Sequence, residues 1–257
     1  MVDLIGYFLF AFAGLFFGLF GSGGSIIIIP VLIYIFSIPI YEATTYSLLL
    51  VFLVSLFGTL THIKQNSFKI SDIVYFAVPS VIFTALSRAI LFPAIPDFIS
   101  FLNISKHSFL MVLFAIVIFF SGISLFKKHS IDVRSNLKPL LISLGILVGV
   151  LSGLLGIGGG FIIVPTLIIF ANMDIKSAAS SALFVITANT FLALILEITI
   201  FQFKFDAYFI LSILLSGLVG LKIGIMLLNR IDLDVVKKMF SISLLFLSFV
   251  ILIIELL

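Results

Sequence analysis

The chain of 257 residues has no cysteine and no tryptophan, and few of its residues are charged. Without cysteine it can form no disulfide, no thiolate metal site and no cysteine nucleophile. Charged residues make up 10% of the chain, against about a quarter in a soluble domain. Apolar residues make up 63%. This composition predicts a protein of the lipid bilayer.

The number and placement of the charged residues limit the kinds of partner that the chain can bind. Its formal net charge is only +3, and most basic residues lie in predicted loops rather than on one face. Nucleic-acid binding is therefore not expected. We expect no cofactor and no metal. The partners expected from sequence are lipid and a small-molecule anion, and the sequence leaves open whether the chain forms a homo-oligomer.

A pattern of glycines followed by a proline occurs twice, at a constant offset of 135 residues. The first copy, GLFFGLFGSGGSIIIIPVLI, starts at Gly14, and the second, GVLSGLLGIGGGFIIVPTLI, starts at Gly149. The ungapped register then holds as far as Asp97 and Asp232. A duplicated hydrophobic unit with a glycine break at the same place in each copy is typical of transporters, which bind substrate where the two breaks meet.

Each copy belongs to a half with five hydrophobic segments. The segments are roughly 4–20, 24–37, 43–62, 72–93 and 106–126, then 138–155, 160–171, 177–200, 206–228 and 236–256. Four in each half approach the ~20 residues that cross a bilayer. The second of each half is short and contains a proline, so we predict a half-helix or part of a broken span. The expected fold is an all-α polytopic membrane protein with eight to ten membrane segments.

The placement of lysine and arginine predicts the orientation. If all five segments of each half cross, ten loop cations lie on the side of the segment that joins the halves, and only Lys106 and Lys204 lie on the other. This distribution predicts a cytoplasmic linker, 127–137, between a first membrane repeat, 1–126, and a second, 138–257. An odd number of crossings reverses the second repeat, so the halves should be inverted.

The glycine clusters predict an anion site. Gly14 and Gly18, like Gly149 and Gly153, form small-x-x-x-small pairs that favour close helix packing. The denser clusters should break the helix, since each glycine costs about 1 kcal/mol there. The N–H groups that open the next helix favour an anion. The alternative is a tight turn without a ligand. Neither cluster is a nucleotide loop, because Gly-Lys-Ser/Thr is missing.

Polar residues elsewhere in the segments extend the candidate site. Small hydroxyl residues start the third segment of each half, where they either donate to an anion or bond to a neighbouring helix. Arg88, Glu197 and Lys222 are charges inside predicted spans. The two cations either balance an anion or extend toward an interface. Glu197 aligns with His62, either as a proton relay or as a helix-end cap. The candidate substrate-binding residues are Gly21, Ser22, Gly23, Gly24, Ser25, Thr44, Thr45, Gly156, Gly158, Gly159, Gly160, Ser180, Ser181, Asn189 and Lys222.

The paired glycine motif resembles the sulfite exporter TauE/SafE family, also called the toluene sulfonate uptake permease family. The polar helix starts EATTYSLL and KSAASSALF, and the glycine-spaced stretch SGLVGLKIGIMLLNRID, extend the resemblance over essentially the whole chain. It implies an inner-membrane transporter of anions such as sulfite, sulfonates or sulfoacetate. The chain departs from the family pattern where Ser25 replaces a glycine, and where Pro79 and Arg88 stand in a segment that has glycines in the second half.

The sequence thus predicts a secondary transporter of a small oxyanion or organosulfur anion in the cell inner membrane, not an enzyme. An intramembrane enzyme would need a nucleophile with a base, or paired carboxylates, at depth. A structural subunit of a larger complex remains a third possibility. The identity of the anion, the direction of transport and coupling to protons are left open.

Overall fold

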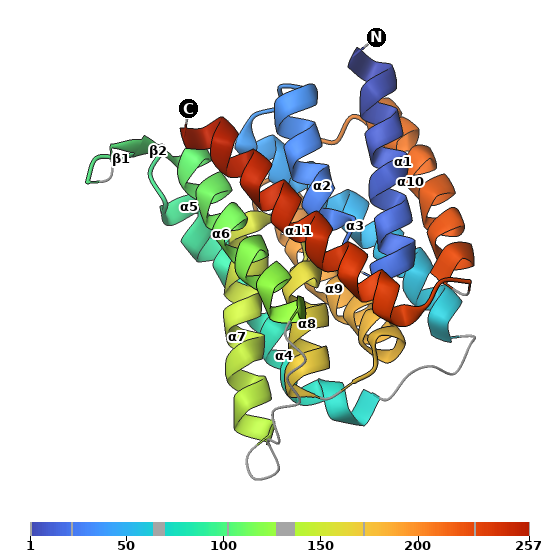
Figure 1. The fold of residues 1–257 in the computed structure, drawn as a ribbon. Coiled ribbons are helices and arrows are strands. Elements are labelled where there is room, and N and C mark those ends of the chain that lie inside the picture. Colours follow the sequence, from blue (N-terminus) through green and yellow to red (C-terminus); the bar gives the residue numbers. More distant parts are fainter. Residues whose placement is uncertain are drawn as a thin grey trace.

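The computed structural model describes residues 2–21, 23–63, 70–101, 103–126, 137–171, 173–228 and 230–256. Helices account for most of them (Figure 1). The first half comprises α1 (Val2–Phe20), α2 (Ser25–Pro30), η1 (Val31–Ile35), α3 (Ile40–Ile63), α4 (Ile70–Leu86), η2 (Ser87–Leu91), α5 (Phe92–Ala94) and α6 (Lys106–Phe126). The second comprises α7 (Leu137–Leu155), α8 (Gly160–Phe170), α9 (Ile175–Thr199), α10 (Ala207–Leu228) and α11 (Leu233–Leu256).

The prediction of an all-α membrane protein is confirmed. Each of the ten predicted segments is helical, and seven helices are long and apolar enough to cross a membrane. Where the chain is described, the only strands are the two-residue β1 (Phe98–Ile99) and β2 (Ile104–Ser105), which pair antiparallel. The short second segments are also confirmed as helices too short to span alone. The predicted linker lies almost entirely outside the described residues.

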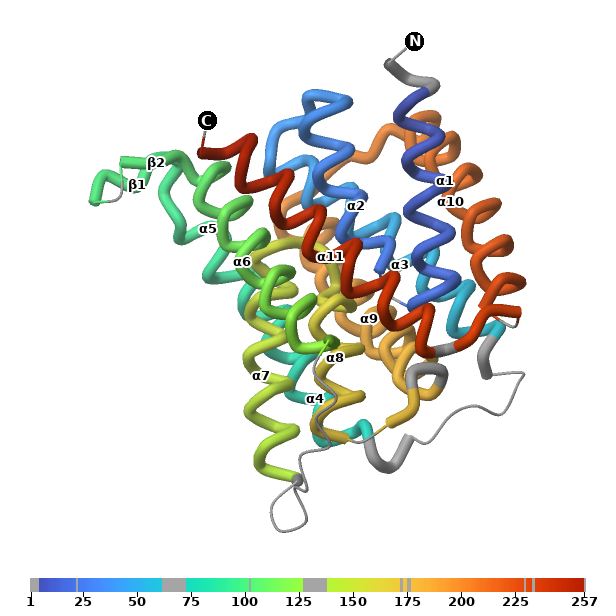
Figure 2. The backbone as a smooth tube through the Cα atoms, in the orientation of Figure 1, coloured from blue at the N-terminus to red at the C-terminus, as the bar shows by residue number. Residues whose placement is uncertain are grey.

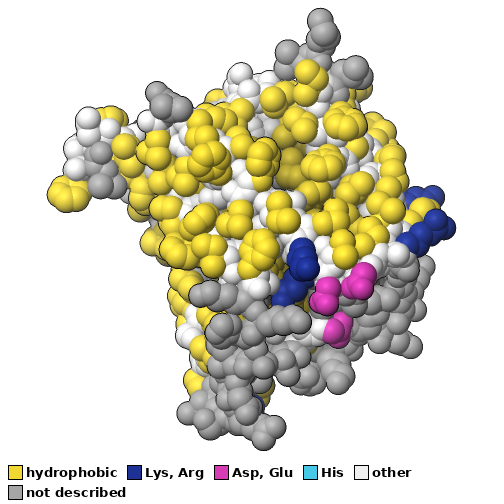
Figure 3. Space-filling view, in the orientation of Figure 1, with side chains coloured by type: hydrophobic (Ala, Val, Ile, Leu, Met, Phe, Trp, Pro, Cys, Tyr) yellow, Lys and Arg dark blue, Asp and Glu magenta, His cyan; other side chains and the backbone are white. Residues whose placement is uncertain are grey.

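The lateral surface of the bundle is apolar. Large hydrophobic side chains such as Ile242, Phe246 and Phe249 of α11 are exposed. Figure 3 shows a broad area of hydrophobic side chains on one face of the molecule, with a few charged side chains at its lower edge. In lipid such a surface needs no further cover, because lipid tails are as apolar as these side chains.

Helices of the two halves pair in a repeating way. The most extensive contacts join α1 with α10, α4 with α7, α6 with α11 and α3 with α9. In the repeat, α1 is equivalent to α7, and α4 is equivalent to α10. The contact of α1 with α10 therefore corresponds to the contact of α7 with α4. The tube in Figure 2 shows α1 beside α10 and α4 beside α7. The contact pattern is therefore the same when the halves are exchanged.

The direction of the paired helices is also informative. Along α3 and α9, contacts run from Phe52 with Phe191 to Thr59 with Thr187, so residue numbers rise in one helix as they fall in the other. The contacts of α6 with α11 run the same way, because Ser241 donates to the Gly122 carbonyl and Ser248 to the Ala115 carbonyl. Equivalent helices of the two halves are thus antiparallel. This is the arrangement that an inverted repeat produces.

The small-x-x-x-small glycines lie where α1 meets α10 and where α7 meets α4. A Cβ atom on Gly14 would lie 1.9 Å from the Gly217 carbonyl oxygen, and one on Gly149 would lie 2.5 Å from the Ser80 carbonyl oxygen. Both positions therefore bring one backbone directly against another, which any side chain would prevent. The packing role predicted for these glycines is confirmed.

The two halves differ in backbone at two places. In the first half the helix after Pro30 continues as the π-helix η1, and α4 passes into the π-helix η2, whereas the equivalent stretches of α8 and α10 are regular α-helices. A π-turn holds one more residue than an α-turn and so rotates the side chains that follow it. Short π-helical turns are often found at functional sites. The one at η2 carries Arg88.

Candidate anion site

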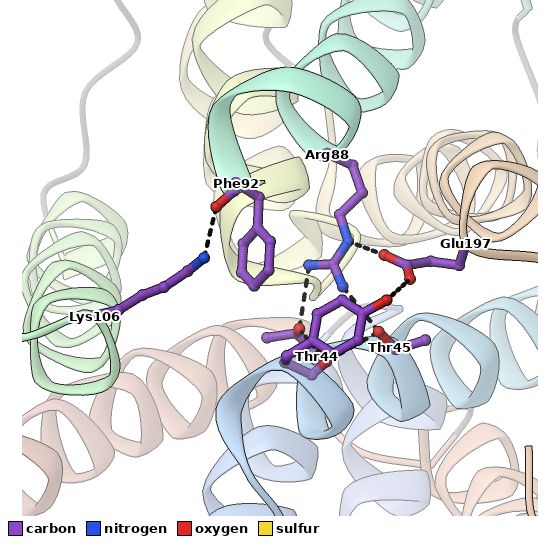
Figure 4. Close-up of polar contacts among 7 residues, drawn as sticks. Thr44, Thr45, Arg88, Phe92, Lys106 and Glu197 are labelled. Carbon is purple, nitrogen blue, oxygen red and sulfur yellow. Dashed lines mark hydrogen bonds and ion pairs between the residues drawn. The ribbon is translucent and has the colours of Figure 1, made fainter. Parts of the chain in front are cut away.

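Arg88 is buried inside the bundle and points between the two halves (Figure 4). Its Nε forms an ion pair with Glu197 Oε1, near the end of α9, and both side chains are 0% exposed. A fully buried charge is very costly unless it is paired and hydrogen-bonded. Extension of Arg88 toward an interface, one of the two interpretations of the sequence, is therefore wrong.

Two predicted site residues complete the contacts of Arg88. Its Nη1 donates to Thr44 Oγ1 at 3.1 Å, and its Nη2 donates to Thr45 Oγ1 at 2.9 Å. Both hydroxyls in turn donate to the Tyr41 carbonyl in the first turn of α3. Each threonine hydroxyl donates its proton to the backbone and accepts from Arg88 through an oxygen lone pair. The guanidinium thus has its orientation set by α3 on one side and by α9 on the other.

Aromatic rings surround the ion pair. The Tyr41 hydroxyl donates to Glu197 Oε2 at 3.0 Å. The Phe92 ring has the Arg88 guanidinium 4.1 Å from its centre, and the Lys106 ammonium is also 4.1 Å from that centre. Figure 4 shows the ring between these two cations. Lys106 is held in place by donating to the Phe92 carbonyl at 2.7 Å. Phe92 therefore separates a buried cation from a more exposed one.

A cavity of about 240 Å³ leads to this cluster. It is lined by Ile40, Tyr41, Phe92, Pro93, Asp97, Lys106, Glu197 and Phe201. A void must hold at least about 10–15 Å³ of probe volume to take one water, so this one has room for several waters or a small anion. Charged side chains of both signs line it. Its walls come from the start of α3, the end of α9 and the connection from α5 to α6.

The second glycine break lies next to the same cluster. A Cβ atom on Gly156 would lie 2.6 Å from the Thr44 Cβ, so Gly156 packs directly on the helix turn that holds Arg88. The first break makes the equivalent contact, because a Cβ on Gly21 would lie 2.6 Å from the Ala179 Cβ at the start of α9. Each break therefore contacts the third helix of the other half. Both glycines have positive φ, which ends the preceding helix.

The remaining predicted residues lie at several places. Ser22 is outside the described residues. Gly23 packs against Phe20 and Phe240, and Gly24 against Ala13 and Phe17. Gly158, which has positive φ, faces Ile186, Thr190 and Val51. Gly159, also of positive φ, faces Ser152. Ser25, Gly160, Ser180 and Ser181 are buried.

Asn189 and Lys222 do not join the Arg88 cluster. The buried Asn189 donates to Ser80 Oγ at 2.9 Å, whereas Lys222 is exposed on α10. At the second break, a void next to Thr44 and Ile157 measures only about 10 Å³, too little for an anion in this conformation. Binding of an anion there stays a prediction. The side chain of His62 is not described, but α3 and α9 are antiparallel, so positions 62 and 197 lie at opposite ends of the bundle.

The sequence named Arg88 and Glu197 as buried charges but did not pair them. The signal available was their opposite charge within a membrane, where each needs a partner. No such signal marked Tyr41 or Phe92, because an aromatic residue at a segment end is common in membrane proteins.

The fold is that of an all-α polytopic membrane protein, and comparison with known proteins identifies the family. A family model described as Sulfite exporter TauE/SafE matches residues 7–251. The chain belongs to this family, which confirms the resemblance seen in the glycine motif. It is also 30% identical over 190 residues to a probable membrane transporter protein of Methanocaldococcus jannaschii, covering 70% of this chain and 67% of the relative. No solved structure matches.

Proposed function

We propose that the chain is a secondary transporter of a small oxyanion, such as sulfite or an organic sulfonate, across the cell inner membrane. The observation that carries this proposal is the Arg88 guanidinium, fully buried between the two halves and held by hydroxyls from one half and a carboxylate from the other. A guanidinium presents a planar fork of donors that matches the oxygens of sulfite or a sulfonate. We infer that the transported anion binds this fork.

Two structural features support a transporter with alternating access. Equivalent helices of the halves are antiparallel, as expected of inverted repeats, in which substrate binds where the broken helices meet. The cavity reaches Glu197, the ion-pair partner of Arg88, from one end of the bundle, while the space beside Thr44 and Ile157 is closed. The sequence contains no ATP-binding motif, so ion or substrate gradients would supply the energy. Family membership favours this function over an intramembrane enzyme.

Counterflow in proteoliposomes tests the proposal. Purified protein is reconstituted into liposomes loaded with unlabelled sulfite or methanesulfonate, and uptake of the labelled anion is followed at mildly acidic and neutral pH. We expect labelled anion to exchange well above the level in protein-free liposomes. If neither anion exchanges at either pH, the proposed function is wrong.

The threonines next to Arg88 predict a change in affinity. Replacing Thr45 by valine removes the acceptor of Arg88 Nη2 while keeping the shape of the side chain. Hydrogen bonds to charged groups contribute about 1.5–3 kcal/mol, so KM for the anion should rise about tenfold or more. Thr61→Val is the matched control, because Thr61 only donates to a backbone carbonyl of its own helix on the exposed surface. If Thr45→Val and Thr61→Val have the same KM, Thr45 does not contribute to anion binding.

The inverted arrangement predicts the sides of the membrane on which loops lie. Cysteines are introduced at Lys138, Arg230 and Lys204 on this naturally cysteine-free chain and labelled with an impermeant maleimide. We expect Lys138→Cys and Arg230→Cys to react from the cytoplasm and Lys204→Cys from the outside, because α7 starts, and α10 ends, at one end of the bundle (Figure 1). Labelling of Lys138→Cys and Arg230→Cys from opposite sides would show that the short helices do not complete crossings.

A further inference from the structure

Glu197 occupies the position on Arg88 that a bound oxyanion would take. Its Oε1 accepts from Arg88 Nε, and the other two nitrogens already donate to Thr44 and Thr45. An incoming sulfite or sulfonate therefore meets a guanidinium whose best acceptor is a carboxylate of the protein itself. Two anions on one buried cation would leave a net negative charge in a site that is 0% exposed, which is very costly. The carboxylate must lose its charge before the substrate can bind.

We propose that Glu197 is the proton-coupling residue of this transporter and that each monoanion travels together with one proton. This proposal rests on the proposed function. In the resting state the +1 charge of Arg88 is balanced by Glu197. When a proton that enters through the cavity as hydronium binds Glu197 Oε1, the carboxyl group becomes neutral and its charge-assisted bond to Arg88 Nε is lost. A monoanion then takes its place, and the buried site is neutral again.

The surroundings of Glu197 favour this exchange. The Tyr41 hydroxyl donates to Oε2, so the carboxyl group stays anchored through one oxygen while the other changes its proton. Lys106 and Asp97 line the same cavity as Glu197. Lys106 therefore presents a positive charge to an anion that enters, and Phe92 lies between this cation and Arg88. Proton and anion thus reach the ion pair from one cavity.

The charged and titratable groups around Glu197 come from few elements. They are Arg88 of η2, Tyr41 of α3, Lys106 of α6 and Asp97 of the preceding connection. Of the other helices packed on α9, α8 contains no titratable residue and α7 contains only Lys138, which is exposed. Titratable residues of the remaining neighbours are Asp72 and Tyr75 in α4, Asp3 and Tyr7 in α1, and Asp234, Lys237, Lys238 and Glu255 in α11. In the part of the chain that is described, Arg88 is thus the only group that forms an ion pair with Glu197.

The test measures accumulation of methanesulfonate, whose own charge does not change with pH. Proteoliposomes of the native protein are given either a pH gradient, alkaline inside, or a membrane potential set by potassium and valinomycin. One proton per monoanion predicts about tenfold accumulation for each pH unit, since one unit is worth about 1.36 kcal/mol. A membrane potential alone should drive none, because the pair carries no net charge. Accumulation driven by the potential and not by the pH gradient would overturn the proposal.

Variants then identify the residue. Glu197→Gln keeps an acceptor for Arg88 but cannot exchange a proton, so accumulation driven by the pH gradient should be lost, and any uptake that remains should respond to the membrane potential instead. The matched control is Glu255→Gln, which removes another largely buried carboxylate, bonded to Tyr34 and His107. It should keep the tenfold accumulation per pH unit. If Glu197→Gln also keeps it, Glu197 does not carry the proton. Absence of any counterflow by the native protein would instead reject the proposed function.

Discussion

Replacing Arg88 by glutamine is expected to abolish anion transport and to lower the free energy of unfolding by about 3–5 kcal/mol. The reason for the second effect is that Glu197 remains buried with a charge and no cation. Transport is lost because the fork of donors for the anion is gone. Thermal unfolding in detergent and counterflow in proteoliposomes measure the two effects separately.

A second substitution shows whether the loss of transport is caused by the loss of stability. Arg88→Gln combined with Glu197→Gln leaves no buried charge, so most of the lost stability should return, while transport should not. Lys222→Gln serves as the comparison, since Lys222 is exposed on α10 yet belongs to the site predicted from sequence. If Lys222→Gln loses transport while the double variant transports at the native rate, the anion binds Lys222 and not Arg88.

Replacing Gly14 by alanine is expected to lower the free energy of unfolding by about 3 kcal/mol, the upper end of overpacking effects. The new Cβ would lie 1.9 Å from the Gly217 carbonyl oxygen, so α1 and α10 would have to move apart. Neither backbone can yield locally, because both belong to regular helices. Thermal unfolding in detergent measures the loss.

Gly217→Ala is the matched control on the same pair of helices. A Cβ on Gly217 meets only Val54 at 3.7 Å and the Phe10 carbonyl at 3.9 Å, which are ordinary contacts. Alanine in a helix is favoured over glycine by about 1 kcal/mol, so this variant should be as stable as the native protein or more so. Equal destabilisation by both variants would show that α1 and α10 do not approach as closely as described.

The sequence alone was sufficient for the helices, their breaks and the family. Long continuous apolar segments form helices in lipid, because a helix satisfies every backbone group within its own segment. Positive φ at Gly21 and Gly156 follows from local chemistry too, because glycine enters that region at little cost. The repeat is visible in the sequence because equivalent positions of the two halves contact equivalent residues and so require the same residue types. Gly21 packs on Ala179 as Gly156 packs on Thr44.

Only the tertiary structure decided which charges meet. Arg88 and Glu197 are 109 residues apart in the chain, and their contact depends on how η2 packs against α9. The repeat register places Arg88 opposite Ile223, which is 46% exposed on α10. The same position is therefore buried in one half and exposed in the other. One residue turns a helix by about 100°, so the π-turn of η2 is sufficient to change the direction of a side chain. Residue spacing in the sequence does not determine that rotation.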